Sequence, residues 1–111
     1  MSDTATLKRQ LKIKSGAAKR LLKEHNSYRN EAEQLQLKRD KLIADGAEEW
    51  DVKNAGRLVE ESNKMVVDTA HRLGSTVQEL RELVVDAKKK TELAGDDDLL
   101  KAEDALEEAS V

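Results

Sequence analysis

Few residues in this sequence could carry out catalysis or bind a metal ion. His25 and His71 are the only histidines, cysteine is absent, and no HExxH or cysteine-pair spacing supplies zinc ligands. We therefore expect His25 to be a partly buried structural residue and His71 a surface residue. The three aspartates at residues 96–98 lack the alternating ligands, central glycine and terminal glutamate of a calcium loop. They suit a helix N-terminus, where negative charge is favourable.

Adjacent carboxylates, as at Glu60 and Glu61 or at Glu107 and Glu108, could in principle act as acid and base. Such chemistry needs a water-excluding pocket that shifts their pKa values, and a thin helical protein of this size offers none. There is also no glycine-rich phosphate loop and no nucleophile with a matched base. The sequence predicts a protein that is not an enzyme and that uses no cofactor, metal or small-molecule substrate.

A basic stretch near the N-terminus is the strongest candidate for a binding site. Seven basic residues and no acidic one lie between Thr4 and Lys23, although the whole chain has a net charge of -3. The candidate partner-binding residues in this stretch are Lys12, Lys14, Lys19, Arg20 and Lys23. Either the acidic segment at residues 96–111 lies alongside and neutralises the stretch, or the stretch binds an acidic macromolecule. We favour an acidic protein over nucleic acid, because the chain is acidic overall and lacks interleaved aromatic residues.

Composition predicts the elements that carry these residues. The chain has no proline or phenylalanine, one tryptophan and one tyrosine, and 39% charged residues, which is typical of long helices. With 111 residues we expect one all-α domain spanning residues 1–111. The polar start is unlike a secretory signal and no apolar run could cross a membrane. The simplest expectation is a soluble intracellular protein without membrane contact.

Apolar residues recur at steps of three and four, which predicts helices over about 4–44, 50–93 and 96–110. Breaks at Asp45-Gly46 and Ala94-Gly95 separate them. The first spacing pattern runs through Leu7, Leu11, Lys14, Ala18, Leu21, His25, Tyr28, Ala32, Leu35, Arg39 and Leu42. The second runs through Ala55, Leu58, Ser62, Val66, Thr69, Leu73, Thr76, Leu80, Leu83 and Ala87.

Short connections make neighbouring helices antiparallel, so we expect a coiled-coil-like antiparallel three-helix bundle with two long helices and one short. The short third helix should cover the end where the first helix starts and the second ends. The opposite end is then a bare two-helix hairpin with exposed apolar area, a candidate partner site or homodimer contact. Its candidate residues are Leu42, Trp50 and Leu58.

Three sequence blocks resemble the tubulin-folding cofactor A family. The first is LKIKSGAAKRLLKE at residues 11–24, followed by Tyr28, Glu31 and Ala32. The second is DGAEEWDVK at residues 45–53, and the third is ESNKMVVD at residues 61–68, followed by an Arg-Leu pair. Val67 stands where the family usually has proline and Trp50 where it often has tyrosine. The missing proline should leave the second helix straighter there.

The resemblance implies a small helical chaperone that is not an enzyme and does not use a nucleotide. Members of the tubulin-folding cofactor A family capture β-tubulin folding intermediates released by the cytosolic chaperonin and pass them toward αβ-tubulin assembly. We further expect a location in the cytoplasm, associated with the cytoskeleton, and a monomer or weak homodimer. The alternative is a structural coiled-coil tether with no client-holding role, which would self-associate strongly.

Overall fold

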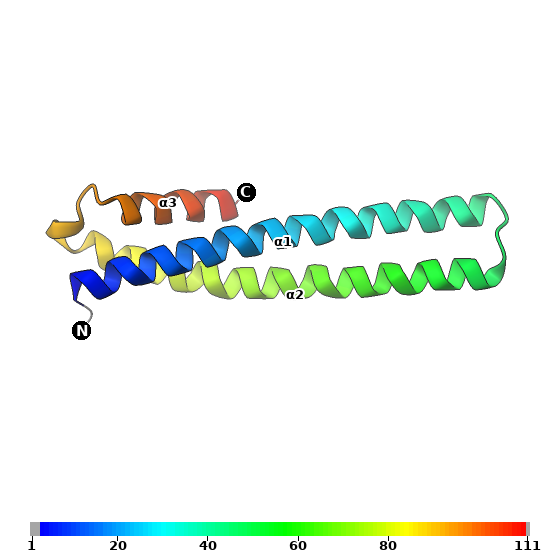
Figure 1. Cartoon of the computed structure of the whole chain (residues 1–111), viewed down its shortest axis with the longest axis horizontal. Coiled ribbons are helices and arrows are strands. Elements are labelled where there is room, and N and C mark those ends of the chain that lie inside the picture. Colours follow the sequence, from blue (N-terminus) through cyan, green and yellow to red (C-terminus); the bar gives the residue numbers. More distant parts are fainter. Residues whose placement is uncertain (1–2, 111) are drawn as a thin grey trace. The chain divides into compact units, whose positions relative to one another are not determined.

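The computed structural model describes residues 3–110, and helices make up most of that range (Figure 1). Helix α1 spans Thr4–Ala44 and α2 spans Glu49–Lys88. A short 3-10 helix, η1, spans Thr91–Leu93, and α3 spans Asp97–Ala109. No strand occurs among the described residues, so the all-α prediction is confirmed.

The ends of α1 are set by two local signals in the sequence. Asp3 is the N-cap, because its carboxylate accepts a hydrogen bond from the Thr6 amide at 2.7 Å. At the other end Gly46 adopts a left-handed φ of 71°. The Ala47 amide then bonds back to the carbonyl of Leu42, and the Gly46 amide to that of Ile43. These are the two bonds of a Schellman ending, in which glycine tolerates the positive φ without a steric penalty.

The chain forms two compact units. We call the first the three-helix unit; it contains the residues up to 22 and those from 72 onward. The second, the hairpin unit, contains residues 23–71. Whether residues 1–111 fold as one cooperative domain stays a prediction of the sequence.

The three-helix unit contains a continuous apolar core. The start of α1, the end of α2 and α3 all contribute to it, as the bundle prediction required. Leu11, Leu80 and Ala102 are fully buried there. The remaining buried members are Leu7, Ala18, Val84, Ala87, Leu93, Leu99 and Ala105. The short third helix therefore covers the end at which α1 starts and α2 finishes.

The end of α2 differs from the sequence prediction, which carried this helix to about residue 93. The helix ends at Lys88, and the chain turns through η1 before α3. Leu93 explains the difference, because it is buried in the same core as Ala87. At roughly 100° per residue, a continuous helix would point Leu93 well away from the face of Ala87. Breaking the helix brings Leu93 into the core.

The hairpin unit has only two helical segments, joined by the short loop after Ala44. Its buried apolar residues are small or medium in size: Ala32, Ala55 and Val59. Ser62 and Thr69 are buried beside them. A two-helix contact cannot bury both sides of its packing face, so apolar side chains such as Leu37 and Val67 stay more than half exposed.

Candidate protein-binding surfaces

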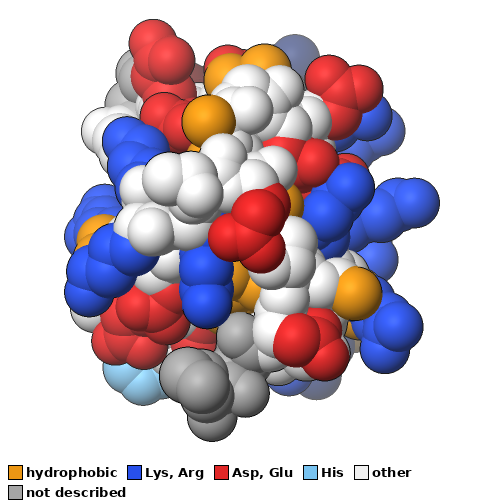
Figure 2. Space-filling model, turned by 90° about the vertical axis from the view of Figure 1, so that its left-hand side faces the viewer, with side chains coloured by type: hydrophobic (Ala, Val, Ile, Leu, Met, Phe, Trp, Pro, Cys, Tyr) orange, Lys and Arg blue, Asp and Glu red, His pale blue; other side chains and the backbone are white. Residues whose placement is uncertain are grey.

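The three-helix unit carries a basic surface on α1, formed by Arg9, Lys12, Lys19 and Arg20. All four side chains are exposed. At roughly 100° per residue they fall within an arc of about 100°, on the side of the helix away from the buried core positions. On the face shown in Figure 2, Lys and Arg side chains are interspersed with Asp and Glu, and hydrophobic side chains form only small separate areas.

Two uncharged residues lie within or directly beside this basic surface. Ile13 is 59% exposed, although isoleucine is usually buried. Gly16 is exposed, and a Cβ added there would meet nothing within 4 Å. The basic surface therefore combines four cations with one exposed apolar side chain and a stretch of bare helix backbone.

Lys8 and Lys14 are engaged in ion pairs inside the three-helix unit. The Nζ atom of Lys8 lies 3.0 Å from Oδ1 of Asp96. Lys14 pairs with Glu79 of α2. Both lysines are half-buried, so they hold helices together and are less available to a partner than the four residues of the basic surface.

The contact between Lys8 and Asp96 shifts the pKa of both groups. The hydrogen bond from Lys8 lowers the pKa of the Asp96 carboxyl, and the amides of Leu99 and Asp98 add to the effect. The same hydrogen bond raises the pKa of Lys8. Asp96 therefore performs two tasks, since its other oxygen caps α3 by accepting from the amides of Asp98 and Leu99. A helix N-terminus at residues 96–98 was predicted, and a contact between the acidic segment 96–111 and the basic stretch of α1 was one of the two readings of that stretch; the pair of Lys8 and Asp96 is such a contact.

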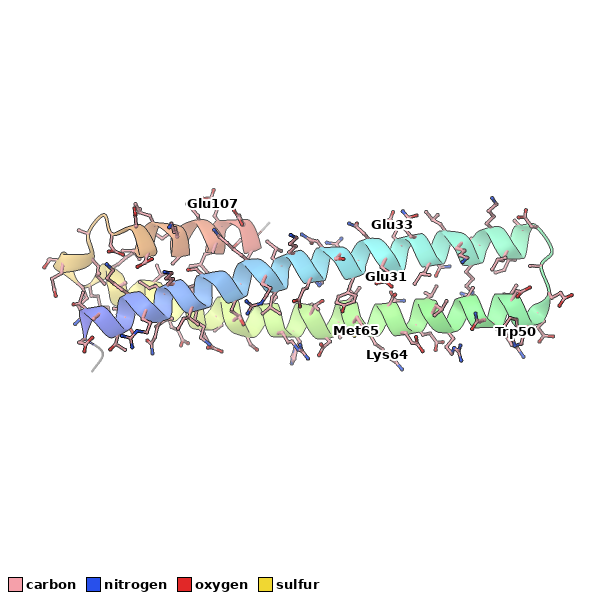
Figure 3. The ribbon with its side chains drawn as sticks, viewed as in Figure 1. Glu31, Glu33, Trp50, Lys64, Met65 and Glu107 are labelled. Carbon is pink, nitrogen blue, oxygen red and sulfur yellow. The ribbon has the colours of Figure 1, made fainter. Side chains whose placement is uncertain are left out.

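The remaining sequence-predicted binding residues lie in the hairpin unit. Lys23 is exposed, whereas Leu42 and Leu58 are half-buried between the two helices. Trp50, in the first turn of α2, is 72% exposed (Figure 3). Ile43, just before the loop, is 52% exposed. Exposed apolar area thus lies at the loop end of the hairpin.

The histidines take the places expected of them. His25 is half-buried, and its Nδ1 lies 2.9 Å from Oγ1 of Thr69 within the hairpin unit. His71 is exposed. Among residues 3–110, no group of three or more His, Cys, Asp or Glu side chains could hold a metal ion.

The hairpin unit also contains a polar groove that the sequence reasoning missed. Its volume is about 610 Å³. Helix α1 contributes Asn26, Arg29, Asn30, Ala32 and Glu33. Helix α2 contributes Asn63 and Val66. In Figure 3, Glu33 marks the α1 side, and Lys64 and Met65 mark the turn of α2 that bears the other two residues.

The two spacing patterns become informative about the groove only once the pairing of α1 with α2 is known. The hydrogen bond between His25 and Thr69 sets the register of the antiparallel pair. Seven residues further along α1 and seven back along α2, Ala32 and Ser62 fall at the same level. Both side chains are small, and Ala32 is one of the residues that line the groove.

This arrangement defines a helical protein with exposed charged and apolar surfaces. The family model for tubulin binding cofactor A matches residues 6–106. The chain belongs to this family. No described helix is long and apolar enough to span a membrane.

Relatives from animals and plants are similar along most of the chain. Tubulin-specific chaperone A from Homo sapiens is 36% identical over 80 residues, covering 72% of this chain and 74% of the relative. Tubulin-folding cofactor A from Arabidopsis thaliana is 32% identical over 87 residues, covering 78% and 77%. The resemblance drawn from the three sequence blocks is thereby confirmed.

Solved structures show the same fold. Human tubulin chaperone cofactor A superposes with a TM-score of 0.81 at 28% identity, covering 95% of this chain and 99% of that one. The crystal structure of tubulin folding cofactor A from Arabidopsis thaliana gives 0.84 at 26% identity, covering 94% and 95%. The three-helix fold class is confirmed as well.

Proposed function

We propose that this protein is a tubulin-folding chaperone. It captures β-tubulin folding intermediates after their release from the cytosolic chaperonin and passes them toward αβ-tubulin assembly. The proposal includes no catalytic step and no cofactor, nucleic acid or membrane. It places the protein in the cytoplasm, associated with the cytoskeleton, because that is where its client is assembled.

The observation that carries the proposal is family membership over residues 6–106. The surfaces of the chain support it independently. A chaperone without nucleotide must hold its client through exposed groups. The basic surface of α1 and the exposed Trp50 and Ile43 are such groups.

The basic surface of α1 and the exposed apolar side chains of the hairpin unit suit two different kinds of client surface, acidic and apolar. Cations on the basic surface attract acidic client surface over a distance and raise the rate of encounter. Exposed apolar side chains of the hairpin cover apolar client surface until assembly buries it. Lys12, Lys19, Arg20 and Lys23 are therefore proposed contacts of the first kind. Trp50 is a proposed contact of the second kind. Leu42 and Leu58 are half-buried, and each is proposed to contribute only the part of its side chain that stays exposed. Lys14, half-buried and paired with Glu79, is proposed as a weaker basic contact.

Charge reversal tests the basic contacts. We expect a variant with Glu at Lys12, Lys19, Arg20 and Lys23 to lose about tenfold or more in capture of β-tubulin in a pull-down, because attraction becomes repulsion. A matched control reverses four exposed basic residues elsewhere, Arg57, Arg81, Lys89 and Lys101, and should capture normally. Undiminished capture by the first variant, with an unchanged helical circular dichroism spectrum, would remove the basic contacts from the mechanism.

Sedimentation at micromolar concentration tests the proposed monomer or weak homodimer against the tether. A monomer that binds purified β-tubulin supports the chaperone. An obligate oligomer that is indifferent to tubulin would support a structural tether and contradict the proposal.

A further inference from the structure

The groove in the hairpin unit is lined by an unusual set of residues. The chain has four asparagines, and three of them, Asn26, Asn30 and Asn63, line this one groove. All three are exposed and lie inside long helices. Asparagine is a poor residue for a helix interior, because its side chain competes for backbone hydrogen bonds. Most other exposed positions of these helices hold Glu, Lys, Arg or Gln, which favour helix, so helix formation does not explain the asparagines.

Within residues 3–110, the three groove amides form no hydrogen bond with another protein group. By contrast, the fourth asparagine, Asn54, accepts a hydrogen bond from Arg57 at 2.8 Å. Each groove amide therefore offers one carbonyl acceptor and one NH₂ donor to a ligand. That is the complement of the N–H and C=O of a peptide group.

The spacing of the amides also fits a peptide. Asn26 and Asn30 are four residues apart on α1, which places them about 6 Å apart along the helix axis at ~1.5 Å per residue. An extended chain repeats its orientation every two residues, or about 6.6 Å. Successive groove amides can therefore meet successive equivalent peptide groups of one extended segment.

The charge of the groove and its apolar residues restrict the kind of ligand that it can bind. Arg29 and Glu33 carry opposite charges, so the lining is neutral and does not select an acidic segment as the basic surface does. Ala32 and Val66 give the groove a small apolar part. Small-molecule pockets are predominantly apolar and enclosed, and this groove is mainly polar.

We infer that the groove binds an extended, uncharged segment of a partly folded polypeptide through its main chain. Asn26 and Asn30 bond to the peptide groups from α1, and Asn63 does so from α2. An apolar side chain of the segment packs on the half-buried Val66. The inference rests on the proposed chaperone function, since the segment belongs to the client. It explains how a chaperone can hold a client before its side chains are in place.

The test uses a variant with Ala at Asn26, Asn30 and Asn63, which removes the amides and raises helix propensity. A matched control removes three amides outside the groove, at Gln10, Asn54 and Gln78. The probe is a set of overlapping 15-residue peptides covering β-tubulin. We expect the full-length protein to bind uncharged apolar peptides, the groove variant to bind them at least about tenfold more weakly, and the control to bind as the original does.

A second probe distinguishes recognition of the peptide main chain from non-specific hydrophobic binding. N-methylation of alternate peptide groups in a bound peptide should weaken binding to the original protein and have little effect on the groove variant. Equal binding by the original and the groove variant would overturn the inference, as would binding of acidic peptides alone or no peptide at all. If peptides bind as expected but β-tubulin intermediates are not captured, the proposed function fails and the groove assignment stands.

Discussion

Asp96 joins two parts of the three-helix unit through one carboxylate. One oxygen caps α3 and the other accepts a charged hydrogen bond from Lys8 of α1. Capping needs only an oxygen, whereas attraction to Lys8 needs the charge. The two contributions can therefore be separated by substitution.

We expect unfolding stability at neutral pH to fall in the order original, Asp96→Asn, Asp96→Ala. Asparagine keeps the capping oxygen and loses the charge, whereas alanine loses both. Urea denaturation followed by circular dichroism measures the order. An Asn variant no more stable than the Ala variant would show that capping contributes nothing at this position.

The same comparison predicts a pH dependence. Because its folded-state pKa is lowered, Asp96 binds its proton less readily in the folded chain than in the unfolded one. Its contribution is therefore complete above the unfolded pKa and is lost as pH falls through the folded pKa. The difference in unfolding free energy between the original and Asp96→Asn should therefore shrink as the pH falls through the folded-state pKa of Asp96. Asp3, whose pKa is lowered by its bond to the Thr6 amide, supplies an acid-dependent contribution common to both proteins.

At the scale of the helix, a glycine can either lower or raise the stability of the fold, depending on its backbone conformation. Gly74 lies inside α2, is exposed, and has open space where a Cβ would be. Gly46 ends α1 with a φ of 71°. Alanine suits the first conformation and is strained in the second.

Gly74→Ala should raise the free energy of unfolding by up to about 1 kcal/mol, and Gly46→Ala should lower it by about 1–2 kcal/mol. Thermal unfolding of the two variants beside the original measures both changes. A stabilising Gly46→Ala would contradict the left-handed turn.

The helices themselves could be predicted closely from sequence, because their signals are local. All positions in the two apolar spacing patterns are buried or half-buried, including Lys14 and His25. The end of α2 could not be predicted from the sequence, because the burial of Leu93 depends on its packing with α3 and with the start of α1. Lys14 falls in the first spacing pattern and Lys12 does not, so the sequence separates the half-buried lysine from the exposed one. The partner of Lys14, Glu79, lies on another helix and could not be predicted from spacing within α1. The groove needed the pairing of α1 with α2, which spacing within one helix does not contain.

At the scale of the whole molecule, the two units differ in how much they bury. The three-helix unit has ten buried apolar residues in one cluster. In the hairpin unit, Ala32, Ala55 and Val59 are the buried apolar residues among those described. Local stability follows buried apolar contact, so the hairpin unit should open more readily.

Native-state hydrogen exchange should show this difference. Amides within residues 23–71 should exchange through openings of lower free energy than the helical amides around Leu11, Leu80 and Ala102.

Two substitutions extend this prediction. Leu80→Ala should lower the free energy of unfolding by about 2–5 kcal/mol and lower protection in the three-helix unit. Leu42→Ala, at a half-buried site, should lower it by less and act mainly in the hairpin unit. Equal protection in both units, or equal effects of the two substitutions, would show that buried apolar area does not set where the chain opens. If the expected pattern is found, the candidate client contacts at Trp50 and in the asparagine groove lie in the part that adapts most easily to an irregular client.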